Sequence, residues 1–178
     1  MAGHSHWKQI KTQKGAADKK RGQVFSKLLA AISVAARSEP NPQFNIRLRA
    51  AILKAKENHV PQESIERATS RVLGQNENAE ELTIEAYGPG GSALIIEAIT
   101  SSSNRTMNEL KQILKDHDAK LAPPGSVRWA FDPPQGEFFD WRPKFPQTLD
   151  SLTKEKNGVL IAELKNQTDV QNVYTNIK

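Results

Sequence analysis

Cysteine is absent from this chain of 178 residues. Without a thiol there can be no disulfide, no thiolate metal site and no cysteine nucleophile, and such a composition fits a reducing compartment. Long apolar runs are absent too, because no stretch approaches the about 20 residues that a helix needs to span a bilayer. The N-terminal segment is polar and lysine-rich, without the apolar core of a secretory signal. We therefore expect a cytoplasmic protein that is neither exported nor embedded in a membrane.

A mitochondrial transit peptide would also be basic and poor in acidic residues. Gly3, Gly15 and Gly22, together with the lack of an amphipathic stretch rich in Arg and Ser, argue against one. The mitochondrial matrix remains the alternative location if the chain is a processed organellar form.

The four histidines do not form a metal-ligand pattern. His4 and His6 lack the Cys, Asp or Glu cluster that would complete three or four ligands. His59 and His117 lie near expected helix C-termini, where histidine is a favourable terminal residue. Since no catalytic triad with motif support and no carboxylate pair in an apolar setting is recognisable, an enzyme is the weaker hypothesis. We expect no metal and no cofactor.

The charge of the chain is unevenly distributed. Residues 1–74 contain 14 Lys and Arg against 5 Asp and Glu, a net charge of +9, whereas residues 75–178 contain 11 against 15, a net charge of −4. Clustered cations attract phosphate at long range and gain affinity by releasing its counterions. The asymmetry indicates a polyanionic partner for the first half, although a merely solvated basic surface explains the composition equally well.

Apolar residues at helical spacing predict three helices in the first half, at residues 18–37, 41–58 and 61–74. Asn41 followed by Pro42 is typical of an N-cap and a first helical position, and Gly74 is the expected C-terminal glycine of the third helix. Residues 1–75 are therefore expected to form a basic arm followed by a three-helix domain. A polar linker is expected at residues 75–81.

After this linker the pattern becomes strand-like. Residues 82–87 and 92–100 are β-rich runs that flank Gly88–Gly91, where proline at the second and glycine at the third position suit a type II turn. The turn lacks the Gly-Lys-Ser/Thr ending of a phosphate-binding loop and leads into a strand instead of a helix. We expect a structural β-hairpin and not a phosphate cradle.

Thr106 and Glu109 match the capping box of a helix ending near His117. The other expected elements are strands at 127–131 and 137–141, a helix between 149 and 166, and a strand at 170–174. This order predicts an α+β fold for residues 76–178: a sandwich with helices on one face of a mainly antiparallel sheet.

The basic arm carries the candidate nucleic-acid-binding residues: His4, His6, Trp7, Lys8, Lys11, Lys14, Lys19, Lys20, Arg21 and Lys27. Lysine makes long-reaching phosphate contacts, and an indole can stack on an unpaired base. Arg105 is a further candidate phosphate contact at a helix start, although capping alone explains most of the Ser101–Asn104 segment. The alternative for the arm is a flexible, solvated tail with Trp7 packed on the helices. Between the two, the residues favour nucleic acid.

Motifs along nearly the whole chain resemble those of the YebC/PmpR family. In the first half these are Ala2–Trp7, Ile10-Lys11, Lys14, Asp18, Asn45, Arg47–Arg49, Ala55-Lys56, Pro61 and Ile65–Ala68. In the second half they are Tyr87–Gly91, Asn104–Thr106, Gly125–Val127, Trp129, Phe131 and Asp169–Asn176. Each piece is weak by itself, but together they are highly specific.

The resemblance implies a helical N-terminal domain, an α+β remainder and membership of a group described as DNA-binding transcriptional regulators. It also implies a rival function, because the family includes the mitochondrial translational activator of cytochrome c oxidase subunit I, and bacterial members are linked to ribosomes stalled on proline-rich sequences. DNA and ribosomal RNA are thus both expected partners, the ribosome among them. The sequence leaves open the target, the direction of regulation and the oligomeric state.

The chain departs from the family pattern in three places. The family's third domain is expected to be absent, because residues 132–136 alone join Phe131 to Glu137. His6 replaces a lysine that is common after Ser5, and Ser38-Glu39 replaces a glycine-rich loop. Activities that depend on the inserted domain are therefore in doubt.

Overall fold

The computed structural model of the chain describes residues 3–70, 79–136 and 139–178, with side chains from residue 17 onward. It divides into two compact units, residues 1–71 (unit 1) and residues 72–178 (unit 2). The boundary predicted after residue 75 and the predicted helix-terminal Gly74 both lie outside the described residues.

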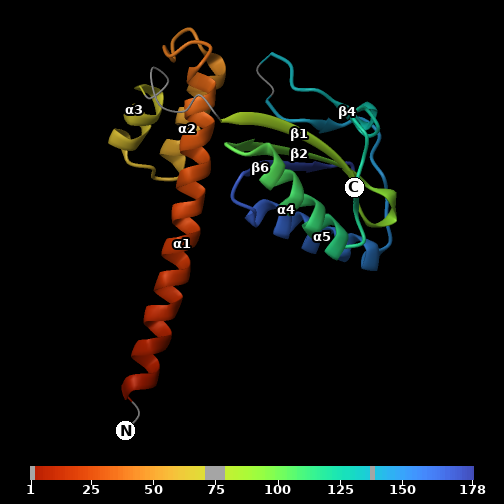
Figure 1. Ribbon diagram of the computed structural model, residues 1–178, viewed down its shortest axis with the longest axis horizontal. Helices are drawn as coiled ribbons and strands as arrows, with labels where there is room; N and C mark the ends of the chain where they lie inside the picture. Colours follow the sequence, from red (N-terminus) through yellow and green to blue (C-terminus); the bar gives the residue numbers. More distant parts are fainter. Residues whose placement is uncertain (1–2, 71–78, 137–138) are drawn as a thin grey trace. The chain divides into compact units, whose positions relative to one another are not determined.

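The described residues of unit 1 form three helices, α1 (Gly3–Ala36), α2 (Ile46–Glu57) and α3 (Gln62–Ser70). Figure 1 shows α2 and α3 lying against the later part of α1. The buried apolar side chains there come from all three helices: Leu28, Ile32, Leu48, Ala55, Ile65 and Ala68. Burial of this shared apolar face stabilises helices that would be marginal alone.

The first helix begins much earlier than predicted. We expected a basic arm ahead of a helix starting at residue 18, but the backbone is helical from Gly3. Lysine, glutamine and alanine are good helix formers, and isolated glycines such as Gly15 and Gly22 cost only about 1 kcal/mol each in a helix interior. The arm is therefore the first half of α1.

The second helix begins later than predicted, at a different asparagine. The N-cap is Asn45, whose side-chain oxygen accepts a hydrogen bond from the Leu48 N–H at 2.9 Å. Its amide nitrogen donates to Ala35 O at 2.8 Å and Glu39 O at 2.7 Å, which connects α2 to the end of α1. Asn41 instead accepts from the Gln43 N–H at 3.0 Å and forms a turn. Contacts with α1, which local sequence does not reveal, select Asn45.

Unit 2 contains a four-stranded antiparallel sheet in the order β3-β1-β2-β6. The strands are β1 (Glu80–Tyr87), β2 (Ala93–Thr100), β3 (Lys120–Leu121) and β6 (Val170–Thr175). Two helices, α4 (Ser103–Asp116) and α5 (Ser151–Asn166), cover one face of the sheet (Figure 1). The core between these layers includes Ile84, Leu94, Ile96, Leu110, Leu114, Leu160 and Leu164. The predicted α+β class is confirmed.

The other face of the sheet is covered by residues 122–136 and 139–147, called here the covering segment. Val127, Ala130 and Phe131 of this segment pack against Ala93 and Ile95 of β2. Instead of a strand at 127–131, the segment contains a 3-10 turn, η3 (Arg128–Ala130), and a two-residue strand, β4 (Phe131–Asp132). β4 pairs with β5 (Arg142–Pro143), and residues 139–141 are not a strand. Both predicted strands were therefore wrong over most of their described length.

Thr106 is not a cap. The N-cap of α4 is Ser102, and Thr106 lies buried inside the helix. Its hydroxyl lies 2.6 Å from Asp169 Oδ2 and 2.8 Å from Thr100 Oγ1. The capping-box prediction was wrong because the hydroxyl satisfies a distant carboxylate at the start of β6 and not the N-terminus of its own helix.

The hairpin turn is as predicted. The Gly91 N–H donates to Gly88 O at 3.0 Å, and Gly90 has φ +73° and ψ 14°, as the third position of a type II turn requires. Asn157 of α5 holds this turn through Pro89 O at 3.0 Å and Ser92 Oγ at 2.7 Å. A Cβ on Gly88 would lie 2.5 Å from side-chain oxygens of both Asn157 and Ser92.

The variant Gly88→Ala should therefore lower the free energy of unfolding by about 1–3 kcal/mol, the usual cost of overpacking a buried site. Gly158→Ala is the matched control, because a Cβ at Gly158 in α5 meets nothing within 4 Å. That change should raise stability by about 0.5–1 kcal/mol, since alanine is the better helix residue. Urea unfolding measures both, and equal midpoints for Gly88→Ala and the unmodified protein would contradict the close packing of turn and helix.

Candidate nucleic-acid interface

The described cations of α1 lie in its middle. Lys19, Lys20 and Arg21 are exposed and consecutive, so at about 100° per residue their side chains fan around much of the helix. Arg21 pairs with Asp18 at 3.4 Å, but both side chains are largely exposed and such pairs are weak. Lys27, also predicted to bind, is half-buried nearer the packed end of α1.

The remaining arm residues share the same helix. His4, His6, Trp7, Lys8, Lys11 and Lys14 all fall within the helical backbone of α1, and their side chains lie outside the described residues. From Lys8 to Lys27 the helix rises about 28 Å at 1.5 Å per residue. The structure thus places the predicted binding positions along one continuous helix, and their contacts with nucleic acid remain a prediction.

Sequence reasoning missed the cations of α2. Arg47, Arg49, Lys54 and Lys56 are all exposed on this helix. Arg49 is held against the preceding turn, because its guanidinium donates to Pro42 O at 3.1 Å and Gln43 O at 2.9 Å. The available signal was four cations within twelve residues of an amphipathic helix, which the search for an apolar stripe passed over.

Arg105, the predicted phosphate contact of unit 2, has an intramolecular partner. Its Nη2 lies 2.7 Å from Asp169 Oδ2, and its Nε lies 3.8 Å from Glu109 Oε1. Burial alone would raise the pKa of Asp169, but hydrogen bonds from Thr106 and Arg105 and the Arg105 charge lower it. Asp169 is therefore an anion that holds Arg105 at the start of α4. The phosphate contact stays a prediction, now weakened by this ion pair.

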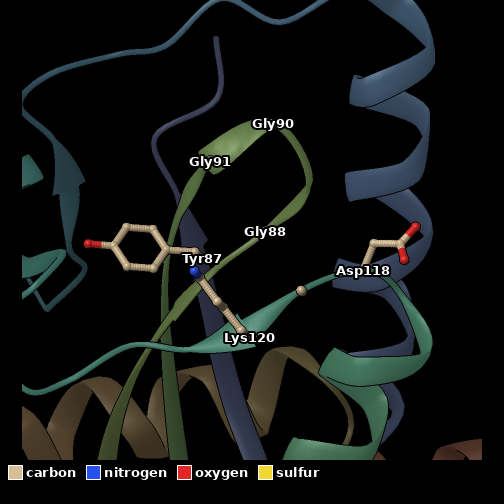
Figure 2. Close-up of a pocket in the computed structure, with 7 residues that line it drawn as sticks. Tyr87, Gly88, Gly90, Gly91, Asp118 and Lys120 are labelled. Atoms are coloured by element: carbon tan, nitrogen blue, oxygen red, sulfur yellow. The ribbon is translucent and has the colours of Figure 1, made fainter.

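The glycine turn borders an open hollow of about 580 Å³ in unit 2 (Figure 2). Lys120 of β3 lies beside the Tyr87 ring, with 6.0 Å between the ammonium and the ring centroid. Asp118 also lines the hollow. A hollow lined by a single lysine and an acidic residue is a poor cradle for phosphate, and the packing of Gly88 already explains its glycine. The structural interpretation of the turn accounts for the observed contacts.

The two described histidines, His59 and His117, lie at helix ends. His117 caps α4, and its Nε2 lies 2.5 Å from Glu163 Oε2 of α5. His59 follows α2 with φ +59°. Among the described residues, no group of three or more His, Asp or Glu side chains is placed to hold a metal ion. Nor is any helix in the described parts both long and apolar enough to cross a membrane.

Comparison with known proteins identifies relatives along nearly the whole chain. The profile of the TACO1/YebC protein N-terminal domain matches residues 5–75, and that of the TACO1/YebC second and third domain matches residues 79–135. A protein of Syntrophus aciditrophicus is 39% identical over 174 residues, which are 96% of this chain and 70% of the relative. The chain belongs to the TACO1/YebC family. The family resemblance of the sequence motifs is thereby confirmed.

Other family members match a smaller share of their own length. Relatives from Desulfosudis oleivorans and Pseudothermotoga lettingae are 45% and 47% identical over 135 residues, 74% of this chain but 55% and 53% of theirs. The chain thus spans about half the length of these relatives. All three are named "Probable transcriptional regulatory protein". The crystal structure of a conserved hypothetical protein from Aquifex aeolicus has a TM-score of 0.80 at 29% identity, covering 90% of this chain and 91% of that one.

Proposed function

We propose that this TACO1/YebC family protein is a non-enzymatic regulator of gene expression that binds nucleic acid along α1. Lys19, Lys20 and Arg21 carry the proposal, because they are exposed on a long helix and fan around its axis. A flat acidic surface could meet only some of these side chains. Phosphates lining a groove or a folded RNA can approach the helix from several sides.

The proposed contacts divide by chemistry. Phosphate is neutralised by the cations Lys8, Lys11, Lys14, Lys19, Lys20, Arg21 and Lys27. His4, His6 and Trp7 approach bases or backbone closely, with the indole available for stacking. Arg105 is a secondary candidate because Asp169 already neutralises it. Lys54 and Lys56 of α2 extend the cationic surface of unit 1.

The names of the curated relatives support regulation of transcription as the leading role. The alternative is a ribosome-associated translation factor that binds ribosomal RNA and relieves stalling at proline-rich sequences, the rival function of the family. Both require a basic helix that meets phosphate. We further propose that the chain lacks the family's third domain near residues 132–136, so partners of that domain are lost.

Crosslinking the protein to nucleic acid in cells, followed by sequencing of the bound fragments, tests the two roles. Reproducible promoter fragments are expected if transcription is regulated. Enrichment of ribosomal RNA would instead establish the translational role. Recovery of neither above the level of a variant with α1 cations replaced by alanine would contradict nucleic-acid binding altogether.

A further inference from the structure

Unit 2 exposes an aromatic pair that the nucleic-acid proposal for α1 does not use. Trp129 is 65% exposed and Phe145 50% exposed, although both belong to residue types that normally bury their rings. Their ring centroids lie 5.6 Å apart with the planes at 44°. The two rings form a small surface on the covering segment, called here the aromatic platform.

Hydrogen bonds within the covering segment hold the aromatic platform in place. The Trp129 indole N–H donates to Ser126 O at 2.8 Å, which satisfies its one polar group and leaves the ring face exposed. The backbone N–H groups of Lys144 and Phe145 both donate to Ala130 O, at 2.8 and 3.3 Å. These bonds hold the Trp129 indole against Ser126 and the backbone of Phe145 against η3, so the protein would lose little conformational freedom when a flat ligand binds.

The loop beneath Trp129 is anchored by a buried carboxylate. Glu85 of β1 accepts hydrogen bonds from the N–H groups of Gly125, Val127 and Arg128, at 2.6, 2.8 and 3.2 Å. The Arg128 guanidinium adds an ion pair, with Nε 2.9 Å from Glu85 Oε1. The exposed tryptophan therefore stands on a rigid loop.

A cation borders the aromatic platform. The Lys144 ammonium lies 5.5 Å from the centroid of the Phe145 ring. Lys144 is exposed, and among the described residues no carboxylate forms an ion pair with it. Aromatic faces next to an available ammonium are the elements with which proteins hold unpaired nucleotides, the ring stacking on the base and the cation meeting the phosphate.

We propose that the aromatic platform binds an unpaired base of single-stranded nucleic acid, with Lys144 contacting the adjacent phosphate. This inference rests on the proposed function and gives it a substrate class. A broad protein partner fits less well. Phe139 of the covering segment is 38% exposed, less than either ring of the platform, and Leu152 and Val159, two other exposed apolar residues of unit 2, lie on α5 across the sheet. The most exposed apolar surface among the described residues of the covering segment is thus two rings set beside a cation.

Binding of fluorescently labelled 12-nucleotide uridylate and of a labelled 12-base-pair duplex tests the proposal. Trp129→Ala should weaken binding of the uridylate about tenfold, the worth of stacking one base, and change binding of the duplex less than twofold. Trp129→Phe keeps an aromatic ring at this position and should retain most of the affinity for uridylate. Leu152→Ala on α5 is the control, and it should change neither the binding of uridylate nor the binding of the duplex.

Two further outcomes separate failure of this inference from failure of the proposed function. If replacing the α1 cations abolishes binding of both probes while Trp129→Ala leaves uridylate binding unchanged, α1 binds nucleic acid and the platform does not. If a ten-residue proline peptide quenches the Trp129-dependent fluorescence and uridylate does not, the platform is a peptide site and the proposal is overturned.

Discussion

Replacing Lys8, Lys11, Lys14, Lys19, Lys20 and Arg21 with alanine should largely abolish nucleic-acid binding at low salt and, with it, the roughly thousandfold fall in affinity that about six phosphate contacts produce between 50 and 200 mM salt. Each phosphate contact releases condensed counterions, so about six contacts give a plot of log affinity against log salt with a slope near −5 on a duplex. The variant should show a slope near −1, because Lys27 remains. Fluorescence anisotropy between 50 and 200 mM salt measures both quantities.

A variant of equal charge separates the α1 surface from net charge. The control replaces six exposed lysines of unit 2 with alanine: Lys111, Lys115, Lys120, Lys154, Lys156 and Lys178. It changes the net charge by the same amount and should retain most of the affinity. Equal losses in the two variants would mean that overall charge, and not α1, binds the polyanion. Circular dichroism checks that α1 stays helical, as alanine should allow.

The variant Glu85→Gln should lower the free energy of unfolding of unit 2 by about 1–3 kcal/mol, the cost of leaving buried hydrogen-bonding groups unsatisfied. The Glu85 side chain is 2% exposed and accepts three backbone hydrogen bonds in addition to the Arg128 ion pair. Glutamine keeps the shape, but it leaves Arg128 without its counter-charge and presents an N–H₂ group to backbone donors. Glu97→Gln is the matched control, since Glu97 is only half-buried on β2 and should cost less.

The same carboxylate should make unit 2 sensitive to acid. Burial acts to raise the pKa of Glu85, but the backbone donors and the Arg128 charge outweigh it and place the pKa below the ordinary 4.5. Because the folded pKa is the lower one, the stabilisation is complete above about pH 4.5 and is lost as the pH falls through the folded pKa. Asp169 acts in the same direction.

Urea midpoints measured from pH 7 to pH 3 test this linkage. The unmodified protein should lose stability below about pH 4.5, and Glu85→Gln should lose less over the same interval because one of the carboxylates with a lowered pKa is gone. An acid dependence identical in the two proteins would show that Glu85 does not titrate with a lowered pKa.

Local patterns predicted those elements whose signals lie within the element itself. The alternating runs around Pro89 and Gly90 gave the β1–β2 hairpin and its turn type, and helical spacing gave the bodies of α2, α3 and α5. A helix start was assigned to the wrong residue where more than one position could act as the N-cap. Asn41 and Asn45 can both cap a helix, and only Asn45 also reaches Ala35 and Glu39.

The covering segment was predicted poorly because its conformation depends on distant residues. Val127 and Phe131 suggested a strand, but Glu85 of β1 gathers the backbone N–H groups of residues 125, 127 and 128 into a turn. Lys144 and Phe145 then hydrogen-bond to Ala130, which places the aromatic platform. None of these contacts has a sequence signature within the segment.

In the candidate site, too, composition could be predicted from the sequence and contacts between distant residues could not. Charge counting located the cationic half of the chain, since charge is a property of composition. It could not reveal that the arm continues α1 as helix or that Arg105 is neutralised by Asp169. Those facts depend on which side chains meet after folding.

Photocrosslinking from single positions tests most directly whether nucleic acid lies against α1. Benzoylphenylalanine replaces exposed Ala17 on α1 in one variant and exposed Leu152 on α5 in another. After irradiation in cells, covalently attached nucleic acid should be recovered from the Ala17 position and be near background at Leu152. Recovery from Leu152 alone, or equal recovery from both, would contradict α1 as the binding surface.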